Sequence, residues 1–383
     1  MRLPTTKTID SLESLATAIH SGVRPLLLFS GGLDGAYLLS TLRTHGIIAL
    51  TVGLGGDAPI ESAKAACSAF GIRHIHIDAR ARFAVDFVGP AISAQAAYAG
   101  GHPICASLSR PLLAQIATEV AGQCDPICNA IIHTSNPSQN SLRRFNGALR
   151  DLGFPGVFGS PFACSHVSRA DKCRALAKAG LPEFVTRAVS MDVNLWGREF
   201  EFGVLDDPEN VTVPPHLYLW TRGPHVSPKP VRLRVTIQRG VPVAIDNAPL
   251  ELVELVDRLN VLVGGYGLGR YIGLEELASG AKVQEVREMP AAFCLFDAYK
   301  RLESATVPYS CIREKMHMEQ IWVQEAVEGR WFGPLRMAAE AFIASVRDAV
   351  TGIVEYELSP GAMTPRSVVA RTPLYVRDRS LLE

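Results

Sequence analysis

A hexapeptide, Ser-Gly-Gly-Leu-Asp-Gly at positions 30–35, has the residue types of a loop that binds phosphate. It stands between a continuous apolar run at 25–29 and a segment at 35–43 whose apolar residues have helical spacing. Backbone N–H groups at the start of such a helix favour an anion, and glycines let a phosphate approach closely. The spacing is neither that of a Walker loop nor that of the dinucleotide motif Gly-x-Gly-x-x-Gly. The residues alone leave two alternatives, an ordinary glycine turn and an anion-binding loop of another type.

With Asp34 and its strand–turn–helix context, the hexapeptide resembles the pyrophosphate loop of the ATP pyrophosphatases. Enzymes of that group cleave ATP between the α and β phosphates, adenylylate an oxygen and release pyrophosphate. Further segments are similar to the argininosuccinate synthetase family, and they follow in family order from about residue 25 to 380. These segments are 97–103, 107–111, 133–145, 190–198 with its Asn-Leu-Trp-Gly-Arg block, 203–208, 267–270 with Glu275, and 329–336.

The resemblance implies a two-step ligase that uses ATP, with Mg²⁺ held by the phosphates and no metal site of the protein's own. Citrulline's ureido oxygen attacks the α-phosphate, and the amine of aspartate then displaces AMP. Such an intermediate needs fixed donors around the leaving pyrophosphate and an amine held in line with the activated carbon. No covalent nucleophile from the enzyme is required.

The resemblance also implies a set of site residues. The catalytic group is Ser30, Asp34 and Arg144. The nucleotide-binding group is Phe29, Ser30, Gly31, Gly32, Asp34, Gly35, Ala36, His133 and Asn140, although a structural role for His133 is an equal alternative. The substrate-binding group is His102, Ser107, Asn136, Asn140, Ser141, Arg144, Ser190, Glu199, Glu275 and Arg287.

The two nucleotide loops depart from the family pattern. Gly35 and Ala36 stand where the family has hydroxyl residues, which removes two side-chain donors worth about 1 kcal/mol each. In the second loop, Ser141 replaces the acid that faces aspartate and Asn136 replaces a threonine. Pro137 removes a backbone N–H from the same loop. The loss of the acid at position 141 predicts weaker binding of aspartate.

The citrulline side is also altered. His102 stands where a tyrosine is expected, Glu199 where a serine is expected, and Arg287 where a second tyrosine is expected. Glu199 and Arg287 introduce charges, so two interpretations remain open. They form an ion pair with each other, or they contact a different end group of the substrate.

The elements that must position these residues alternate between strand and helix in the first 180 residues. Strands are predicted at 25–29, 48–52, 74–78 and 127–132, and helices at 35–43, 60–70 and 107–120. This alternation predicts an α/β fold with a doubly wound parallel sheet that binds nucleotide. Ligands of such sheets bind beyond the carboxyl ends of the strands, so 30–36 and 133–141 are expected at one edge.

The second half reads as an α+β domain. Strands are predicted at 231–239, 241–245, 352–359 and 367–375, and helices at 289–303 and 331–349. The expected domains are therefore 1–183 for ATP binding, 184–360 for substrate binding and oligomerisation, and a short tail at 361–383.

Composition excludes several classes of protein. The 383 residues are 48% hydrophobic and 20% charged, which excludes wholesale disorder, and 38 basic residues balance 38 acidic ones. A neutral chain has no global attraction for nucleic acid or an anionic membrane.

Apolar runs are too short to span a bilayer, and no secretory signal is seen. The eight cysteines indicate buried thiols, which are favoured over a zinc site at Cys124 and Cys128. These features predict a cytoplasmic protein, and the family resemblance implies that it acts on small, amino-acid-like molecules.

Four functions remain as alternatives. The leading one is a carbon–nitrogen ligase of the argininosuccinate synthetase type with altered specificity, in specialised metabolism. The others are an ordinary argininosuccinate synthetase of arginine biosynthesis, a non-catalytic paralogue, and a tRNA-modifying transferase. The last would need a basic face and Cys-x-x-Cys motifs.

The family usually forms tetramers through a C-terminal arm, and the chain ends about where that arm would begin, so we expect a homo-oligomer, either a dimer or a tetramer.

Overall fold

The computed structural model describes residues 8–56, 60–181, 190–201, 203–222 and 229–382. Within these residues a six-stranded sheet has the order β1-β8-β7-β2-β3-β4, and every neighbouring pair is parallel. Its strands are β1 (Thr8–Ile9), β2 (Pro25–Leu28), β3 (Ile48–Gly53), β4 (Arg73–Asp78), β7 (Ala130–Ile132) and β8 (Val157–Gly159). The predicted α/β fold with a parallel sheet is therefore confirmed.

Helices cover both faces of this sheet, because its central strands are apolar on both sides. Leu26 of β2 belongs to a core that it shares with α6, whereas Leu27 belongs to a core shared with α2 and α3. Such two-sided burial is typical of parallel sheets and explains the uninterrupted apolar runs. The helices of this half are α1 (Leu12–His20), α2 (Leu33–Leu42), α3 (Ile60–Ala69), α4 (Arg80–Phe83), α5 (Gly89–Ser93), α6 (Ala106–Gln123), α7 (Ser141–Asp151) and α8 (Arg169–Lys178), with a π-helical turn at Ala84–Val88.

The order of the strands brings the two nucleotide loops together. β2 pairs directly with β7, and Leu27 lies opposite Ile132. The segments that follow these strands therefore leave the sheet side by side at its carboxyl edge, as expected for 30–36 and 133–141.

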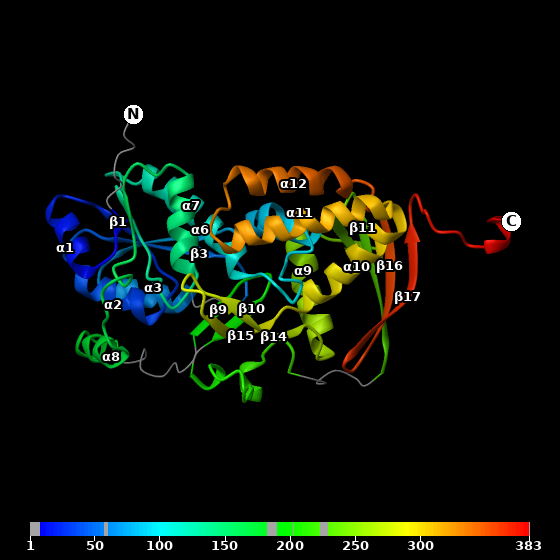
Figure 1. The fold of residues 1–383 in the computed structure, drawn as a ribbon. Coiled ribbons are helices and arrows are strands. Elements are labelled where there is room, and N and C mark those ends of the chain that lie inside the picture. The colour runs from blue at the N-terminus through cyan, green and yellow to red at the C-terminus, as the bar shows by residue number, and fades with distance from the viewer. Residues whose placement is uncertain (1–7, 57–59, 182–189, 202, 223–228, 383) are drawn as a thin grey trace.

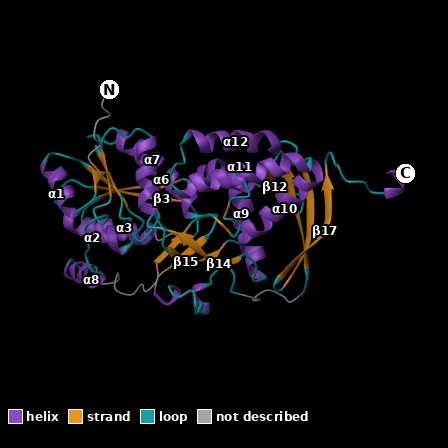
Figure 2. Cartoon of the chain, viewed as in Figure 1, coloured by secondary structure: helices purple, strands orange, loops and turns teal. Residues whose placement is uncertain are grey.

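The second half contains two further sheets in the described part of the chain. A four-stranded antiparallel sheet, β14-β15-β10-β9, lies between the parallel sheet and a five-stranded sheet, β13-β12-β11-β16-β17 (Figures 1 and 2). The first consists of β9 (Ser190–Val193), β10 (Arg198–Glu201), β14 (Arg270–Glu276) and β15 (Lys282–Glu288). The second consists of β11 (Val231–Gln238), β12 (Val241–Ile245), β13 (Ala248–Pro249), β16 (Gly352–Ser359) and β17 (Ala362–Ala370). A small hairpin pairs β5 (Ala97–Tyr98) with β6 (His102–Pro103).

Four helices join the halves through one continuous core. They are α9 (Leu252–Gly265), α10 (Pro290–Thr306), α11 (Tyr309–Val327) and α12 (Pro334–Arg347). Leu255, Leu295 and Trp322 share a buried cluster with residues of α6 and β2. Short 3-10 turns occupy Gly203–Leu205, Pro215–Leu217 and Arg379–Leu382. No helix in the described chain combines the length and apolar character that crossing a membrane requires.

Some predicted boundaries were wrong for identifiable reasons. The helix predicted from 331 begins at Pro334, because Gly333 is its N-cap and proline suits the first helical position. The strand predicted from 127 begins at Ala130, after a loop that contains Pro126. The last strand runs over Ala362–Ala370 rather than 367–375 and pairs with β16.

Candidate active site

The pyrophosphate loop has the backbone geometry that an anion requires. Gly31 has a φ of +77°, which favours glycine, and Gly32 is the N-cap of α2 without a side-chain hydrogen bond. The first backbone N–H groups of a helix have no acceptor within the helix. Those of α2 therefore point toward the carboxyl edge of the sheet, beside the exposed Ser30.

Three residues predicted to bind nucleotide are buried at this loop, namely Phe29, Gly35 and Ala36. Phe29 is 2% exposed and Ala36 is fully buried. A Cβ added at Gly35 would lie 2.5 Å from Cδ2 of the Phe29 ring. The ring therefore occupies the space next to position 35, and these residues can offer a nucleotide only their backbone groups.

Asp34 faces a lysine that the sequence motifs do not include. Its Oδ1 lies 2.8 Å from Nζ of Lys172, in the first turn of α8. The Asp34 side chain keeps 29% of its area exposed. The loop therefore combines open N–H groups with one carboxylate and one ammonium group.

In the second loop, His133 is a buried ring held on both sides. Nε2 lies 3.0 Å from Oδ1 of Asn146, Nδ1 accepts the backbone N–H of Ser135 at 3.4 Å, and Phe145 stacks on the ring at 4.8 Å. This pattern assigns the proton to Nε2. Burial lowers the pKa of His133 to about 4, and Arg110 adds to that effect. The imidazole is therefore neutral at pH 7 and supports the loop.

Two other residues of this loop have protein partners. Oδ1 of Asn136 accepts the backbone N–H of Ser138 at 3.0 Å and its hydroxyl at 2.5 Å, which closes a local turn. The Ser141 hydroxyl accepts Nε–H of Arg110 at 3.1 Å, and Arg110 also pairs with Asp192 at 2.5 Å. Ser141 thus lies beside a cation that already has a carboxylate partner.

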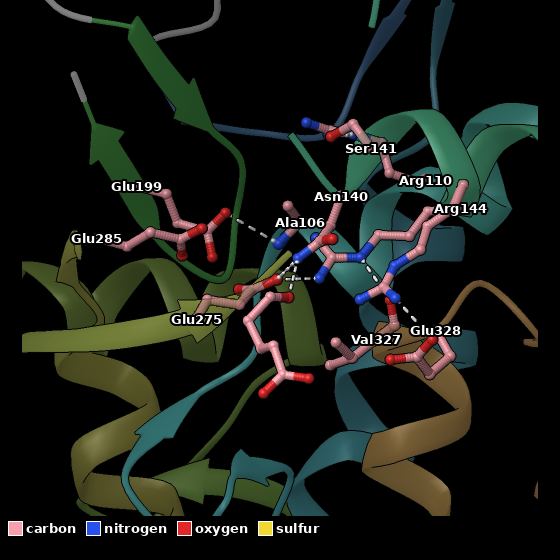
Figure 3. Close-up of polar contacts among 12 residues, drawn as sticks. Ala106, Arg110, Asn140, Ser141, Arg144, Glu199, Glu275, Glu285, Val327 and Glu328 are labelled. Carbon is pink, nitrogen blue, oxygen red and sulfur yellow. Dashed lines mark hydrogen bonds and ion pairs between the residues drawn. The ribbon is translucent and has the colours of Figure 1, made fainter. Parts of the chain in front are cut away.

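Glu275 connects the second loop to the four-stranded sheet (Figure 3). It accepts Nδ2–H of Asn140 at 2.7 Å and pairs with Arg144. All three side chains are buried. Asn140 and Arg144 belong to α7 and its N-cap, whereas Glu275 belongs to β14, so this cluster fixes the two halves around the site.

Arg287 extends the cluster to the position where the family has a serine. Its Nη2 is 2.9 Å from Glu275, its Nε is 2.7 Å from Oε1 of Glu199, and it also pairs with Glu285. The other oxygen of Glu199 accepts the backbone N–H of Ala106 at 3.2 Å, at the first turn of α6. A carboxyl group of the protein itself therefore occupies the N-terminus of that helix.

The three carboxyl groups around Arg287 differ in how readily they ionise. Burial, with Asp192 and Glu275 nearby, raises the pKa of Glu199 to about 8. Burial, with Glu275 and Glu199 nearby, raises the pKa of Glu285 well above its usual value. Burial also opposes ionisation of Glu275, but Arg144 and Asn140 outweigh it and lower that pKa. Glu275 is therefore the ionised carboxylate, and the other two hold protons more readily.

Three buried polar atoms around this cluster have no hydrogen-bond partner among the described residues. They are Nε2 of His102, Oδ1 of Asn140 and Nη1 of Arg287. His102 packs on Gly273 of β14, so its ring lies over the same sheet. Buried polar atoms of this kind normally have a partner, which indicates a site for a polar ligand.

The remaining residues predicted to bind substrate lie near these groups. Ser107 is buried in the first turn of α6, and Ser190 pairs through its backbone with Glu201 at the end of β10. A cleft of about 530 Å³ opens beside the second loop. Its lining includes Pro137, Gln139, Asn140, Arg143, Asn146 and Arg330.

The site also contains residues that the sequence motifs did not single out. Arg110 stood within a recognised segment, but nothing assigned it a contact. Lys172 and Glu285 belong to no recognised segment, and only the fold brings them to the site.

Comparisons with known proteins match one enzyme family over most of the chain. The arginosuccinate synthase N-terminal HUP domain matches residues 24–169, and the C-terminal domain of the same family matches 189–381. The argininosuccinate synthase of Rubrobacter xylanophilus is 34% identical over 362 residues, which cover 93% of this chain and 88% of that protein. That of Pyrococcus furiosus is 32% identical over 344 residues, which cover 88% and 83%. The structure of an NH3-dependent NAD synthetase from Campylobacter jejuni covers 45% of this chain and 74% of its own at 18% identity; its TM-score of 0.29 is too low to support an inference.

Proposed function

The chain belongs to the argininosuccinate synthase family and is an ATP-dependent ligase that forms carbon–nitrogen bonds; we propose that its acceptor and amine differ from citrulline and aspartate. The enzyme is expected to join this acceptor and amine in specialised metabolism, in the cytoplasm. The observation that carries the altered specificity is the position of Glu199.

Glu199 is placed where an anionic substrate group would be favoured. The first N–H groups of a helix attract anions, and here a carboxyl oxygen accepts the N–H of Ala106 at 3.2 Å. A substrate carboxylate at the same helix end would compete with Glu199 for this N–H, and above about pH 8, where Glu199 is ionised, it would also be repelled. Arg287 offsets this charge only in part, because it also faces Glu275 and Glu285. We therefore propose a ureido, amide or carboxyl acceptor that lacks a free carboxylate at that end.

Ser141 supports a change of amine as well. A serine hydroxyl accepts one hydrogen bond from an ammonium group but supplies no countercharge, and a charge-assisted bond is worth about 1.5–3 kcal/mol. In addition, the Ser141 hydroxyl already accepts Nε–H of Arg110. Aspartate is therefore expected to bind about ten- to hundredfold more weakly than it would to an acid at this position.

The reaction needs no covalent bond to the protein. The acceptor oxygen bonds to the α-phosphorus while the bond to the bridging oxygen breaks, and pyrophosphate leaves with the electron pair. The amine then attacks the activated carbon, AMP leaves, and the amine loses a proton. The proposed roles are anion binding by the α2 N–H groups with Ser30, Gly31 and Gly32, and orientation of the acceptor by Arg144 and Glu275.

The residues at the loop fit a magnesium ion that the nucleotide brings. Asp34 is the carboxylate of the loop, and no group of three or more His, Cys, Asp or Glu side chains in the described chain is placed to hold a metal. Magnesium usually needs one or two carboxylates in addition to substrate phosphates. When bound, the ion would neutralise part of the phosphate charge, and Asp34 is the carboxylate of the loop that would hold it.

The test is AMP production with ATP and a panel of acceptors and amines, with citrulline and aspartate as the reference pair. We expect a different pair to support turnover at least tenfold more efficiently. If citrulline with aspartate is the best pair, the enzyme is an ordinary argininosuccinate synthase, and the Glu199–Arg287 contact is only structural.

We also propose a homo-oligomer, a dimer or a tetramer, with contacts from the C-terminal half. β17 is an edge strand on which the Val369 side chain is 50% exposed, and Leu374 and Val376 beyond it are exposed as well. An exposed apolar edge favours pairing with another chain. Light scattering at micromolar concentration should give the mass of two or four chains, and the mass of one chain would contradict this proposal.

A further inference from the structure

Lys172 lies beside the pyrophosphate loop although it belongs to no recognised segment. Its Nζ is 2.8 Å from Oδ1 of Asp34, and its side chain is only 11% exposed. Lys172 stands near the start of α8, and Asp34 stands in the first turn of α2. The ammonium group is therefore one hydrogen bond away from the helix end whose N–H groups lack acceptors.

An aromatic ring holds the lysine in this position. The Phe162 ring centroid is 4.2 Å from Nζ, and Phe162 is 5% exposed. Phe162 follows β8, which shares its carboxyl edge with β7 and β2. The centroid of Tyr37 of α2 lies 6.4 Å from that of Phe162. Lys172 is thus fixed between the segments after β2 and β8, at the edge where ligands of such sheets bind.

The surroundings leave Lys172 able to bind an anion. An ammonium group has three donors, of which Asp34 accepts one and the Phe162 ring faces the cation. The neighbouring positions of the loop carry no side-chain donor, because they are Gly35 and Ala36. A cation at this place would supply the attraction for phosphate that those two positions do not.

We propose that Lys172 binds the phosphate oxygens of ATP that leave as pyrophosphate. This inference rests on the use of ATP described above. As the bond between the α-phosphorus and the bridging oxygen breaks, the electron pair stays on pyrophosphate. The Lys172 ammonium and the α2 N–H groups stabilise that charge, and the lysine keeps its proton. Asp34 accepts one N–H of the ammonium group and so positions it.

The test compares Lys172→Met with Lys178→Met. Methionine keeps an unbranched side chain over Phe162 but removes the charge, and Lys178 is an exposed lysine on the same helix. Binding is measured by calorimetry with ATP, inorganic pyrophosphate and AMP. The affinities of Lys172→Met for ATP and for pyrophosphate should be about ten- to hundredfold lower than those of wild type. AMP, which lacks the β and γ phosphates, should bind within about threefold of wild type. Lys178→Met should change none of the three.

The outcomes separate this inference from the proposed function. Unchanged affinity of Lys172→Met for ATP and pyrophosphate overturns the role of Lys172 and leaves the ligase intact. Equal losses for AMP and ATP also overturn it, because they indicate a structural role. A wild-type protein without affinity for ATP overturns the proposed function itself.

A second pair of variants covers the case in which Lys172→Met does not fold. Lys172→Arg keeps a positive charge, whereas Lys172→Gln keeps a polar group without one. The arginine variant should bind pyrophosphate at least about tenfold more tightly than the glutamine variant, and exchange of pyrophosphate into ATP should follow the same order. Equal affinities would show that the charge at position 172 does not contribute.

Discussion

Glu199 and Arg287 lie directly opposite each other on the paired strands β10 and β15, and Nε of Arg287 is 2.7 Å from Oε1 of Glu199. The contact itself was one of two interpretations of the sequence, and it is confirmed. Glu199 also makes a second contact, because its other carboxyl oxygen accepts the Ala106 N–H at the N-terminus of α6. One side chain therefore joins a cross-strand contact to the N-terminus of α6.

Replacing Asp34 tests the loop. Asp34→Ala should reduce AMP formation at least hundredfold, because it removes the carboxylate that positions Lys172 and that would hold the Mg²⁺ of the nucleotide. Folding should change little, since the Asp34 side chain keeps 29% of its area exposed and the Lys172 ammonium also faces the Phe162 ring. Steady-state AMP production and the thermal midpoint measure the two effects. Turnover within tenfold of wild type would contradict a role for Asp34 in the reaction.

Two substitutions should move specificity toward citrulline and aspartate. Ser141→Asp restores a countercharge for the amine, and Glu199→Ser frees the Ala106 N–H for a substrate carboxylate. The double variant should use the citrulline–aspartate pair about tenfold better than wild type. Ser141→Asn is the control, because asparagine has about the size of aspartate but lacks its charge. If the double variant still binds ATP but does not use citrulline and aspartate better than wild type, Ser141 and Glu199 do not determine the specificity.

The buried acids predict a dependence of stability on pH. Burial raises the pKa of Glu199 from 4.5 to about 8, so the folded state binds more protons than the unfolded state between these values. Its contribution to stability is complete below about pH 4.5 and is lost as the pH rises to about 8. Burial likewise raises the pKa of Glu201 to about 7, which adds to the same trend.

Urea unfolding of wild type and Glu199→Gln across this range measures the effect. Glutamine does not titrate, so the stability of the variant relative to wild type should rise with pH, by at most about 1.4 kcal/mol per pH unit. The charged groups that face Glu199 are Arg110, Arg144, Asp192, Glu275 and Arg287. Parallel curves for the two proteins would contradict the raised pKa.

Glu288 should be essential for folding rather than for chemistry. It is fully buried, pairs with Arg198, and accepts the backbone N–H of Thr221 at 2.7 Å. Glu288→Ala leaves Arg198 unpaired in the core and should cost about 3–5 kcal/mol in urea unfolding. Glu357→Ala, which removes a partly exposed partner of Arg366, should cost less than about 1 kcal/mol. Similar losses for the two variants would contradict this reading.

Much of the fold could be predicted because burial leaves a clear pattern. The strand at 352–359 coincides with β16, whose residues alternate between buried and partly buried positions. The adjacency of the two nucleotide loops followed from the rule for parallel sheets. By contrast, α11 was not predicted, because Lys315 and Glu319 are charged yet buried, where Lys315 pairs with Glu303 and Glu319. Their charges hide the apolar face by which a helix is normally recognised.

The candidate site was predictable only where a residue stands in a motif. Asp34 and Glu275 were found in this way, whereas Lys172 was missed because a lone lysine on a polar helix carries no signal. Its position depends on how α8 packs against α2, which is a property of tertiary structure.

The packing of Phe29 against Gly35 has a consequence for how this loop can change over generations. A side chain at position 35 would lie 2.5 Å from the buried ring, so a hydroxyl residue is accepted there only after position 29 has become smaller or shifted. The two positions are therefore epistatic, and the order of substitutions matters.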